Sequence, residues 1–163
     1  MNHKAAILTV SDGAAEGRRE DVSGPRLVQM LEEAGVQVIE TAVVPDEMDK
    51  ISAQLRLYAD YLKVSLVLTT GGTGLSRRDV TPEATRRVLE RTVPGLAEAM
   101  RAEGLKITPH AVLSRGVCGI RGATLIINLP GGPNAAVEGL KIILPALPHG
   151  LNKLRGDTSD CAR

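Results

Sequence analysis

One stretch of the chain, residues 71–79, concentrates residue types that bind phosphate and metal ions. It reads GGTGLSRRD, with three glycines in its first four residues, two adjacent arginines and a single acid, Asp79. A glycine-rich turn between a strand and a helix lets backbone N–H groups approach an anion closely, and arginines add attraction for phosphate. Asp79 is better suited to holding a metal ion. The stretch predicts a site for a phosphorylated ligand.

A second acid, Asp46, occupies a similar position. Both Asp46 and Asp79 come just after a predicted strand and just before a predicted helix. Helix capping is the alternative role, and it fits Asp46 well. It fits Asp79 less well, because Thr81 is expected at the N-cap and Pro82 at the first helical position. Two carboxylates at one sheet edge are suited to binding one Mg²⁺ together with nucleotide phosphates, as phosphoryl or nucleotidyl transfer requires.

The glycine run does not match the common nucleotide-binding motifs. It is not followed by the Lys-Ser/Thr pair of a P-loop, and its glycines lack the G-x-G-x-x-G spacing of a dinucleotide site. On its own the run GGTG is equally consistent with a tight strand-to-helix turn. The neighbouring arginines and Asp79 favour a ligand.

Few other residues suggest chemistry. Ser114 and Arg115 are either an anion contact or a loop hydroxyl beside a solvated charge. The three histidines show no metal-ligand spacing and no G-x-S-x-G elbow occurs, so neither a histidine metal site nor a hydrolase triad is expected. Cys118 is expected to be a small buried residue rather than a nucleophile.

Strands that alternate with helices are expected to position these residues. Four apolar, β-branched runs predict buried strands, and helices are predicted between and after them. Polar residues 14–22 predict a loop, and residues 105–122 predict an irregular or short-helical segment. The alternation predicts an α/β fold with a mainly parallel sheet. The strands are expected at 5–10, 36–44, 66–70 and 124–129, and the helices at 25–34, up to residue 63 after Asp46, from 82, at 96–103 and at 134–144.

The carboxyl ends of the four predicted strands all carry polar or glycine-rich sequence. These ends are residues 11–13 (SDG), 45–46 (PD), 71–74 (GGTG) and 128–132 (NLPGG). In open parallel sheets, ligands bind beyond the carboxyl ends of the strands. The convergence of four such loops predicts a ligand site at this edge.

The amino-acid composition limits the kinds of partner that are expected for this protein. The chain has 163 residues, a formal charge of +1, and neither Phe nor Trp. Proteins that bind single-stranded nucleic acid stack bases on aromatic side chains, so no nucleic-acid partner is expected. The two cysteines lack a metal or redox spacing, and no run of about 18 apolar residues occurs, so a cytoplasmic protein without a membrane span is expected. One domain is expected over residues 1–155, followed by a polar tail over 156–163.

The ordered series of motifs resembles the molybdenum cofactor biosynthesis proteins of the MogA/MoaB type, a family that includes the G domain of gephyrin. The motifs that carry this resemblance are TVSDG, VVPDE, LVLTTGGTGLSRRDVTPEAT, PGLAEAMR, AVLSRGV and ATLIINLPGGP. They extend from about residue 5 to residue 154, nearly the whole chain. GGTG followed by RRDVTPEAT is the most specific of them.

The resemblance implies a three-layer α/β/α fold, assembled as a homotrimer or, in some members, a hexamer. It implies Mg²⁺-dependent transfer of AMP from ATP to the terminal phosphate of molybdopterin, with release of pyrophosphate. It also implies a downstream molybdenum-insertion protein as a partner. Asp46 and Asp79 are then the catalytic, metal-binding acids. The expected substrate-binding residues are Ser11, Asp12, Gly71, Gly72, Thr73, Gly74, Ser114, Arg115, Asn128, Pro130 and Gly131.

One position departs from the family pattern. Many members have SDR in the first motif, whereas this chain has Gly13 in the third place, and Arg18 or Arg19 is the candidate replacement for the missing arginine. A non-catalytic molybdopterin-binding or scaffold protein of the MoaB type is the alternative function. A different nucleotide-handling enzyme on the same fold, similar to the competence-damage proteins, is a weaker one.

Overall fold

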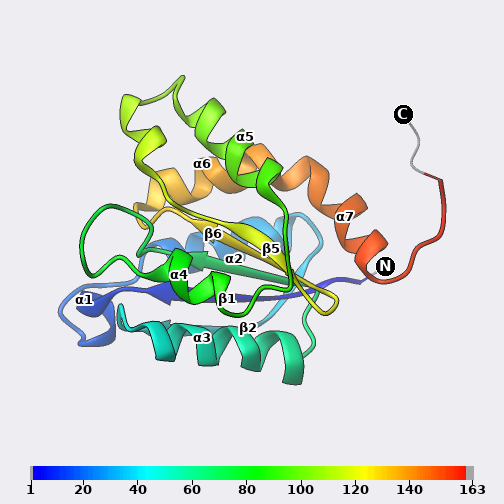
Figure 1. Ribbon diagram of the computed structural model, residues 1–163, viewed down its shortest axis with the longest axis horizontal. Helices are drawn as coiled ribbons and strands as arrows, with labels where there is room; N and C mark the ends of the chain where they lie inside the picture. The colour runs from blue at the N-terminus through cyan, green and yellow to red at the C-terminus, as the bar shows by residue number, and fades with distance from the viewer. Residues whose placement is uncertain (1, 161–163) are drawn as a thin grey trace.

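The structure is a computed structural model that describes residues 2–160, and a six-stranded sheet runs through the middle of that part of the chain (Figure 1). The strand order is β2-β1-β3-β6-β5-β4. The first four strands in this order are parallel, whereas β5 is antiparallel to both β6 and β4. The predicted mainly parallel sheet is confirmed. The strands are β1 (Lys4–Val10), β2 (Gln37–Val44), β3 (Leu66–Thr70), β4 (Arg91–Thr92), β5 (Cys118–Arg121) and β6 (Thr124–Leu129).

Helices cover both faces of the sheet, which creates two hydrophobic cores. Successive side chains of β1 alternate between them, so that Ile7 joins one core and Leu8 the other. The first core lies under α2, α5, α6 and α7, and the second under α3 and α4. Strands covered on both faces are buried along their length, which explains the continuous apolar runs of β3 and β6. The helices are α1 (Asp12–Ala15), α2 (Ser23–Glu33), α3 (Met48–Arg56), α4 (Thr81–Arg86), α5 (Pro94–Gly104), α6 (Pro133–Ile143) and α7 (Leu147–Leu154).

Several elements differ from the sequence-based expectation. The predicted helix to residue 63 ends as an α-helix at Arg56 and continues as a π-helical turn, η1 (Leu57–Tyr61). The irregular segment contains a 3₁₀ turn, η2 (Pro109–Leu113), but also β5, which was not predicted. β4 and β5 are too short to give a periodic pattern; β5 forms on the edge of β6, and β4 forms on the edge of β5.

Two further helices were missed. α1 replaces the first part of the predicted loop, and the Ser11 hydroxyl caps it by accepting from the N–H of Ala14 at 3.2 Å. α7 follows a 3₁₀ turn, η3 (Leu144–Ala146), and Pro148 lies in its first turn, where a missing N–H is tolerated.

The expected N-cap at Thr81 is wrong. α4 begins at Thr81 itself, after Val80, and no side chain caps it. The Thr81 hydroxyl instead donates to the carbonyl of Gly71 at 2.9 Å, and its N–H donates to the carbonyl of Gly72 at 3.1 Å. Thr81 therefore fastens the glycine loop to the start of the helix.

The last described helix ends at Leu154, and residues 157–160 form neither helix nor strand. The rest of the predicted tail, residues 161–163, lies outside the described residues, and so does the second cysteine. No helix in the described part of the chain has the length and hydrophobicity needed to cross a membrane.

Candidate active site

Two cavities border the glycine loop that follows β3. The larger has a volume of about 600 Å³ and the smaller about 460 Å³. Three residues line both: Gly72, Asp79 and Gly131. Ligands in the two cavities would lie next to each other, with Asp79 on the shared wall.

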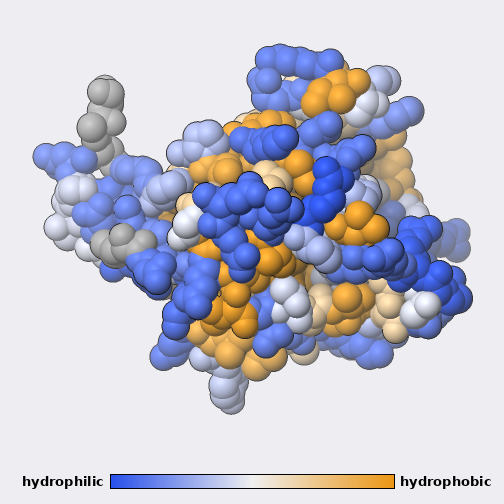
Figure 2. Space-filling model, turned by 180° about the vertical axis from the view of Figure 1, so that it is seen from behind, coloured by the Kyte–Doolittle hydropathy of each residue, from blue (hydrophilic) through white to orange (hydrophobic). Residues whose placement is uncertain are grey.

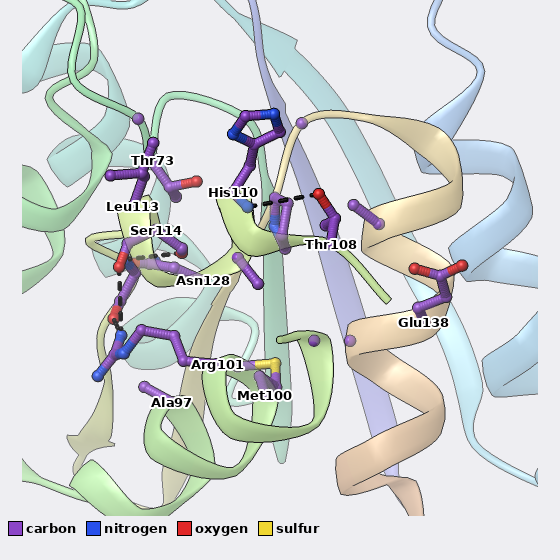
Figure 3. Close-up of a pocket in the computed structure, with 18 of the residues that line it drawn as sticks. Thr73, Ala97, Met100, Arg101, Thr108, His110, Leu113, Ser114, Asn128 and Glu138 are labelled. Atoms are coloured by element: carbon purple, nitrogen blue, oxygen red, sulfur yellow. Dashed lines mark hydrogen bonds between the residues drawn. The ribbon is translucent and has the colours of Figure 1, made fainter. Parts of the chain in front are cut away.

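The larger cavity lies between the glycine loop, α5, η2 and α6, and many of its walls are apolar. Leu75, Met100, Leu113 and Ile142 contribute apolar surface. Figure 3 shows Thr73, His110, Ser114, Asn128 and Glu138 around the same space. A volume of this size accepts a cofactor-sized molecule with a ring system.

The smaller cavity is more polar. Ser11, Arg19, Asp21, Asp46 and Asp79 line it, together with the backbone of the glycine loop. The Asp21 carboxylate is engaged, because it accepts from the Thr9 hydroxyl at 2.8 Å and from the N–H of Gly24 at 3.0 Å. The Arg19 guanidinium makes no hydrogen bond or ion pair with any residue between 2 and 160. Arg19 is therefore available to a ligand.

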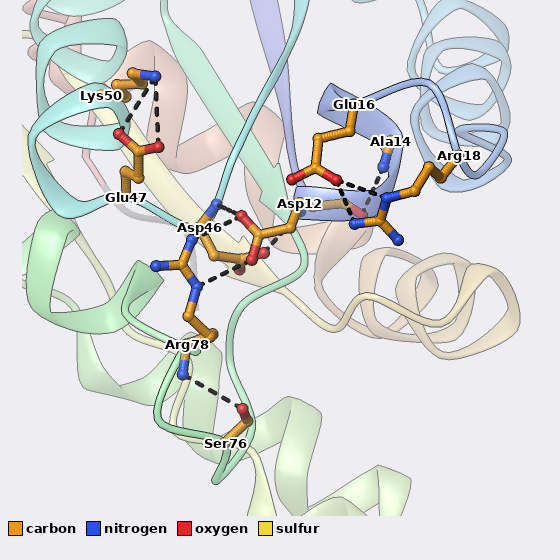
Figure 4. A network of polar contacts seen from close by, with 10 residues as sticks. Asp12, Ala14, Glu16, Arg18, Asp46, Glu47, Lys50, Ser76 and Arg78 are labelled. Carbon is orange, nitrogen blue, oxygen red and sulfur yellow. Dashed lines mark hydrogen bonds and ion pairs between the residues drawn. The ribbon is translucent and has the colours of Figure 1, made fainter.

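The two adjacent arginines after α1 have different surroundings. Arg18 donates from Nε to the Glu16 carboxylate at 2.6 Å and lines neither cavity (Figure 4). Arg19 lines the smaller cavity and lies next to Gly13, where an added Cβ would be 3.4 Å from the Cβ of Arg19, an ordinary van der Waals distance. Of the two candidate replacements, only Arg19 reaches the site.

Asp46 is held by a network at the ends of β1 and β2 (Figure 4). Asp12 and Asp46 each donate a backbone N–H to the other's carboxylate at 2.9 Å. Arg78 grips the Asp12 carboxylate with two hydrogen bonds, from Nε at 3.0 Å and from Nη2 at 2.8 Å. These bonds fix Asp46 relative to the glycine loop that carries Arg78.

The network separates the pKa values of the two acids. Hydrogen bonding to Arg78 lowers the pKa of Asp12, and the N–H of Asp46 lowers it further. Burial raises the pKa of Asp46, against the N–H of Asp12, and the negative charges of Asp12 and Asp79 raise it more. Asp46 is thus a partly desolvated carboxylate close to another acid on the wall of a cavity.

This arrangement fits a divalent cation. A cation between Asp46 and Asp79 would offset both the burial and the repulsion that raise the pKa of Asp46. Within residues 2–160, no group of three or more His, Cys, Asp or Glu side chains could hold a metal ion. A cation here would therefore need further ligands from water or from a phosphate, which is how Mg²⁺ is commonly bound.

The backbone of the glycine loop excludes larger residues. Gly71 and Gly72 have φ of +102° and +66°, a region that side chains disfavour. A Cβ on Gly71 would lie 2.2 Å from the carbonyl oxygen of Val10, and one on Gly72 would lie 3.0 Å from Asp46 Oδ1. Because Gly71 and Gly72 have no side chains, the glycine loop lies directly against β1 and against Asp46.

Arg115 holds the glycine loop in place from outside the two cavities. It donates to the carbonyls of Gly74 at 2.8 Å and Asp79 at 2.7 Å, and it forms an ion pair with Glu83. Its backbone N–H donates to the carbonyl of Thr73 at 2.9 Å. Arg115 lines neither of the two cavities, so its contacts shape the site from outside it.

Asn128 lines the larger cavity, but protein groups occupy its amide. Its Nδ2 donates to the hydroxyls of Thr69 at 2.9 Å and Thr85 at 3.0 Å, and its Oδ1 accepts from the N–H of Val117 at 3.1 Å. The side chain is 1% exposed. Asn128 thereby ties β6, β3, α4 and the segment before β5 together beneath the cavity floor.

Most of the predicted site residues line one or both of the two cavities. Asp12 and Arg115 do not line either cavity, and neither do the two arginines of the glycine stretch, Arg77 and Arg78. His110, which received no role from the sequence, lines the larger cavity, as do Met100 and Arg101 of α5; no spacing in the sequence marks them. The predicted residues that line one or both cavities are Ser11, Asp46, Gly71, Gly72, Thr73, Gly74, Asp79, Ser114, Asn128, Pro130 and Gly131.

Cys118 is buried, as predicted, and 2% exposed. Burial raises the pKa of its thiol to about 12, so the thiol is protonated and inert at neutral pH.

The fold and the paired cavities define an α/β protein with two cavities of small-molecule size at the carboxyl edge of its sheet. Residues 6–149 match the model of the family described as a probable molybdopterin binding domain. The chain belongs to this family.

Some curated relatives are named molybdopterin adenylyltransferase, and two longer ones are named cinnamon and gephyrin. Molybdopterin adenylyltransferase from Helicobacter pylori strain J99 is 42% identical over 153 residues, which cover 93% of this chain and 87% of that protein. The enzyme of the same name from Escherichia coli K12 is 42% identical over 140 residues, or 85% of this chain and 72% of that one. The molybdenum cofactor synthesis protein cinnamon of Drosophila melanogaster is 46% identical over 155 residues. The chain spans only 26% of cinnamon, and 21% of the gephyrin of Dictyostelium discoideum.

Solved structures agree with the fold. MoaB from Thermus thermophilus superposes with a TM-score of 0.91 at 50% identity, covering 95% of this chain and 98% of that one. A MogA structure superposes with a TM-score of 0.88 at 42% identity, covering 93% and 99%. The three-layer α/β fold expected from the resemblance is confirmed.

Proposed function

We propose that this protein is a molybdopterin adenylyltransferase, which moves AMP from Mg²⁺-ATP to molybdopterin in molybdenum cofactor biosynthesis. Bacterial relatives of that name match most of the chain at 42% identity. The observation that carries the proposal is the position of Asp79, which lines both cavities. A transfer between two substrates needs both to meet beside the group that assists it.

The reaction joins the two substrates through phosphorus. An oxygen of the terminal phosphate of molybdopterin attacks the α-phosphorus of ATP, the bond from that phosphorus to the β-phosphate oxygen breaks, and pyrophosphate leaves. The larger, more apolar cavity receives the pterin, and the smaller, polar cavity receives the triphosphate.

The residues of the chain orient the substrates and supply the charges. Asp46 and Asp79 would hold Mg²⁺, which would supply positive charge to neutralise the phosphates during the transfer. Arg19, which lines the same smaller cavity, binds the phosphate chain. Ser114 and Thr73 contact the pterin side, while Arg115 and Asn128 keep the walls in place.

The remaining expectations extend this proposal. We infer a homotrimer, with a hexamer as the alternative, a single domain over residues 1–155 in the cytoplasm, and a downstream molybdenum-insertion protein as a partner. Apolar side chains that protein contacts would bury, among them Tyr61, Leu75 and Ile107, are exposed. Figure 2 shows apolar patches between polar areas on the back face of the molecule. Such surface supports association with other chains.

A non-catalytic molybdopterin-binding or scaffold protein is the second candidate. It is favoured by the match to cinnamon and gephyrin, in which this chain corresponds to about a quarter or less of a longer protein. A scaffold role does not by itself require Asp79 on the wall shared by two cavities and Asp46 on the wall of one of them.

Pyrophosphate release separates the two candidates. The assay contains ATP and Mg²⁺, with and without molybdopterin, and compares the wild type with Asp79→Asn. Asp49→Asn is the control, because the Asp49 side chain is 97% exposed and pairs with Arg87 away from both cavities. We expect release that needs molybdopterin, that Asp79→Asn removes, and that Asp49→Asn retains. Binding of molybdopterin without any release would favour the scaffold.

A further inference from the structure

A third cleft, of about 430 Å³, lies at the antiparallel end of the sheet. It is bordered by the end of α4, by β4, by α5 and by the segment that leads into β5. Three arginines line it, Arg86, Arg101 and Arg115, and among its described lining residues there is no carboxylate. This arginine cleft adjoins the larger cavity, and the residues that line both are Ala97, Arg101, Ser114 and Gly116.

The three guanidinium groups differ in what they already bind. Arg115 is occupied by Glu83 and by two carbonyls of the glycine loop. Arg101 uses Nη1 alone, donating to the carbonyls of Ser114 at 3.4 Å and Gly116 at 3.2 Å (Figure 3). Its Nε and Nη2 have no acceptor among residues 2–160, and the Arg86 guanidinium has no hydrogen bond or ion pair there at all.

Glu83 pairs with Arg115 and attracts Arg86, so it offsets part of the positive charge. No carboxylate of the described residues lines the cleft itself, and a bound anion is attracted by Arg86 and Arg101 together. The guanidinium group donates in a planar fork that matches the oxygens of a phosphate, and such charge-assisted hydrogen bonds are stronger than neutral ones. The hydroxyl of Thr92 adds a further polar group to the wall. Both the charge and the donor geometry therefore select a small oxyanion.

We propose that the arginine cleft binds an oxyanion of the phosphate or pyrophosphate class, held between Arg86 and Arg101. This site needs neither nucleotide nor pterin, and it adjoins the larger cavity, because Arg101 lines both. An oxyanion bound by Nε and Nη2 of Arg101 leaves the Nη1 bonds to the carbonyls of Ser114 and Gly116 in place, and Arg101 itself links the cleft to the larger cavity. Occupancy of the cleft is thereby coupled to that cavity, and this coupling, unlike the binding, rests on the proposed function.

Titration calorimetry with sodium pyrophosphate, at constant ionic strength and without nucleotide or pterin, tests the binding. The variant is Arg86→Ala, and the matched control is Arg87→Ala, whose guanidinium is paired with Asp49 at 3.1 Å. Because the smaller cavity also accepts phosphates under the proposed function, all proteins carry Arg19→Ala in a second series. We expect Arg86→Ala to weaken binding about tenfold in that series, the loss of one charge-assisted contact, and Arg87→Ala to bind as its parent does.

Equal binding by the two variants would overturn the proposal. The proposal would also be overturned if the wild type did not bind pyrophosphate and Arg86→Ala changed the oligomer mass measured by light scattering. In that case the arginines would contribute to an interface between chains. If pyrophosphate binding depends on Arg86 but the protein shows no adenylyl transfer, the proposed function is refuted. The proposal that the arginine cleft binds an oxyanion is then still supported.

Discussion

Asp12 and Asp46 exchange hydrogen bonds: each backbone N–H donates to the other's carboxylate at 2.9 Å. The exchange joins the carboxyl end of β1 to the residue two places after β2. Arg78 then joins Asp12 to the glycine loop. Asp12, which the family resemblance places among substrate ligands, lines no cavity and acts in this structure as a positioning residue for Asp46.

Replacing Asp46 by Asn is expected to abolish turnover without destabilising the fold. Burial raises the pKa of Asp46, so ionising it in the folded protein opposes folding. An asparagine keeps an oxygen that accepts from the N–H of Asp12. The stability advantage of Asp46→Asn should be absent below the ordinary value of 3.8, grow as the pH rises, and level off above the raised pKa of Asp46. Melting temperatures of both proteins across this pH range, with Mg²⁺ excluded, measure it; a variant less stable at pH 7 would contradict the assignment.

Replacing Arg78 by Ala is expected to lower kcat while the fold persists. The hydrogen bonds from Arg78 lower the pKa of Asp12, so Asp12 stabilises the folded state above its unfolded pKa, and this contribution is lost as the pH falls through the lowered value. The variant should lose that part of the acid dependence of stability. Arg87→Ala, which breaks a comparable exposed pair with Asp49, is the control and should keep its activity. Equal kcat values for Arg78→Ala and Arg87→Ala would show that the position of Asp46 does not depend on Arg78.

Arg19→Ala is expected to raise the KM for ATP about tenfold, because hydrogen bonds to charged groups contribute about 1.5–3 kcal/mol. The KM for molybdopterin should change little, since Arg19 lines only the smaller cavity. Arg18→Ala removes the same charge one residue away, where Glu16 already holds it, and should behave as the wild type. Steady-state kinetics with each substrate varied in turn distinguish the two; a similar rise in both variants would mean a general effect of charge.

Gly72→Ala is expected to destabilise the protein and to inactivate it. The backbone strain at φ +66° costs about 1–2 kcal/mol, and the added Cβ would lie 2.3 Å from Thr81 Oγ1. Gly17→Ala is the matched control, because Gly17 has φ +72° but nothing within 4 Å of the new Cβ. Denaturant melts should show a larger loss for Gly72→Ala than for Gly17→Ala. Equal losses would assign the whole effect to backbone strain.

Asn128→Ala is expected to destabilise the fold by about 1–3 kcal/mol, the cost of leaving buried polar groups without partners. The change leaves the N–H of Val117 and the hydroxyls of Thr69 and Thr85 without their present partner. Asn128→Asp is informative beside it, because the carboxylate still accepts from Val117 but no longer donates to the threonines. Urea unfolding measures both; a wild-type midpoint in Asn128→Ala would contradict a structural role.

The sequence by itself determined the elements whose signals are local. Apolar runs mark β1, β3 and β6, because strands covered on both faces need apolar residues throughout. Gly71 and Gly72 mark the loop because only glycine tolerates its backbone, and Asp46 and Asp79 follow strands that end at one edge. The loops that meet at this edge and the mainly parallel arrangement of the strands were therefore predictable from residue types and spacing.

Tertiary structure decided what depends on partners distant in the chain. β5 forms only because β6 offers an edge, and Arg115 and Asn128 bind protein groups 32 to 59 residues away in sequence. The choice between Arg18 and Arg19 depended on which side chain is bound by Glu16 and which one lines the smaller cavity. The division of the site into two cavities that share Asp79 also appears only when α5, η2 and α6 are placed beside the sheet. Local patterns carry no record of such contacts, because they depend on which surfaces the fold brings together.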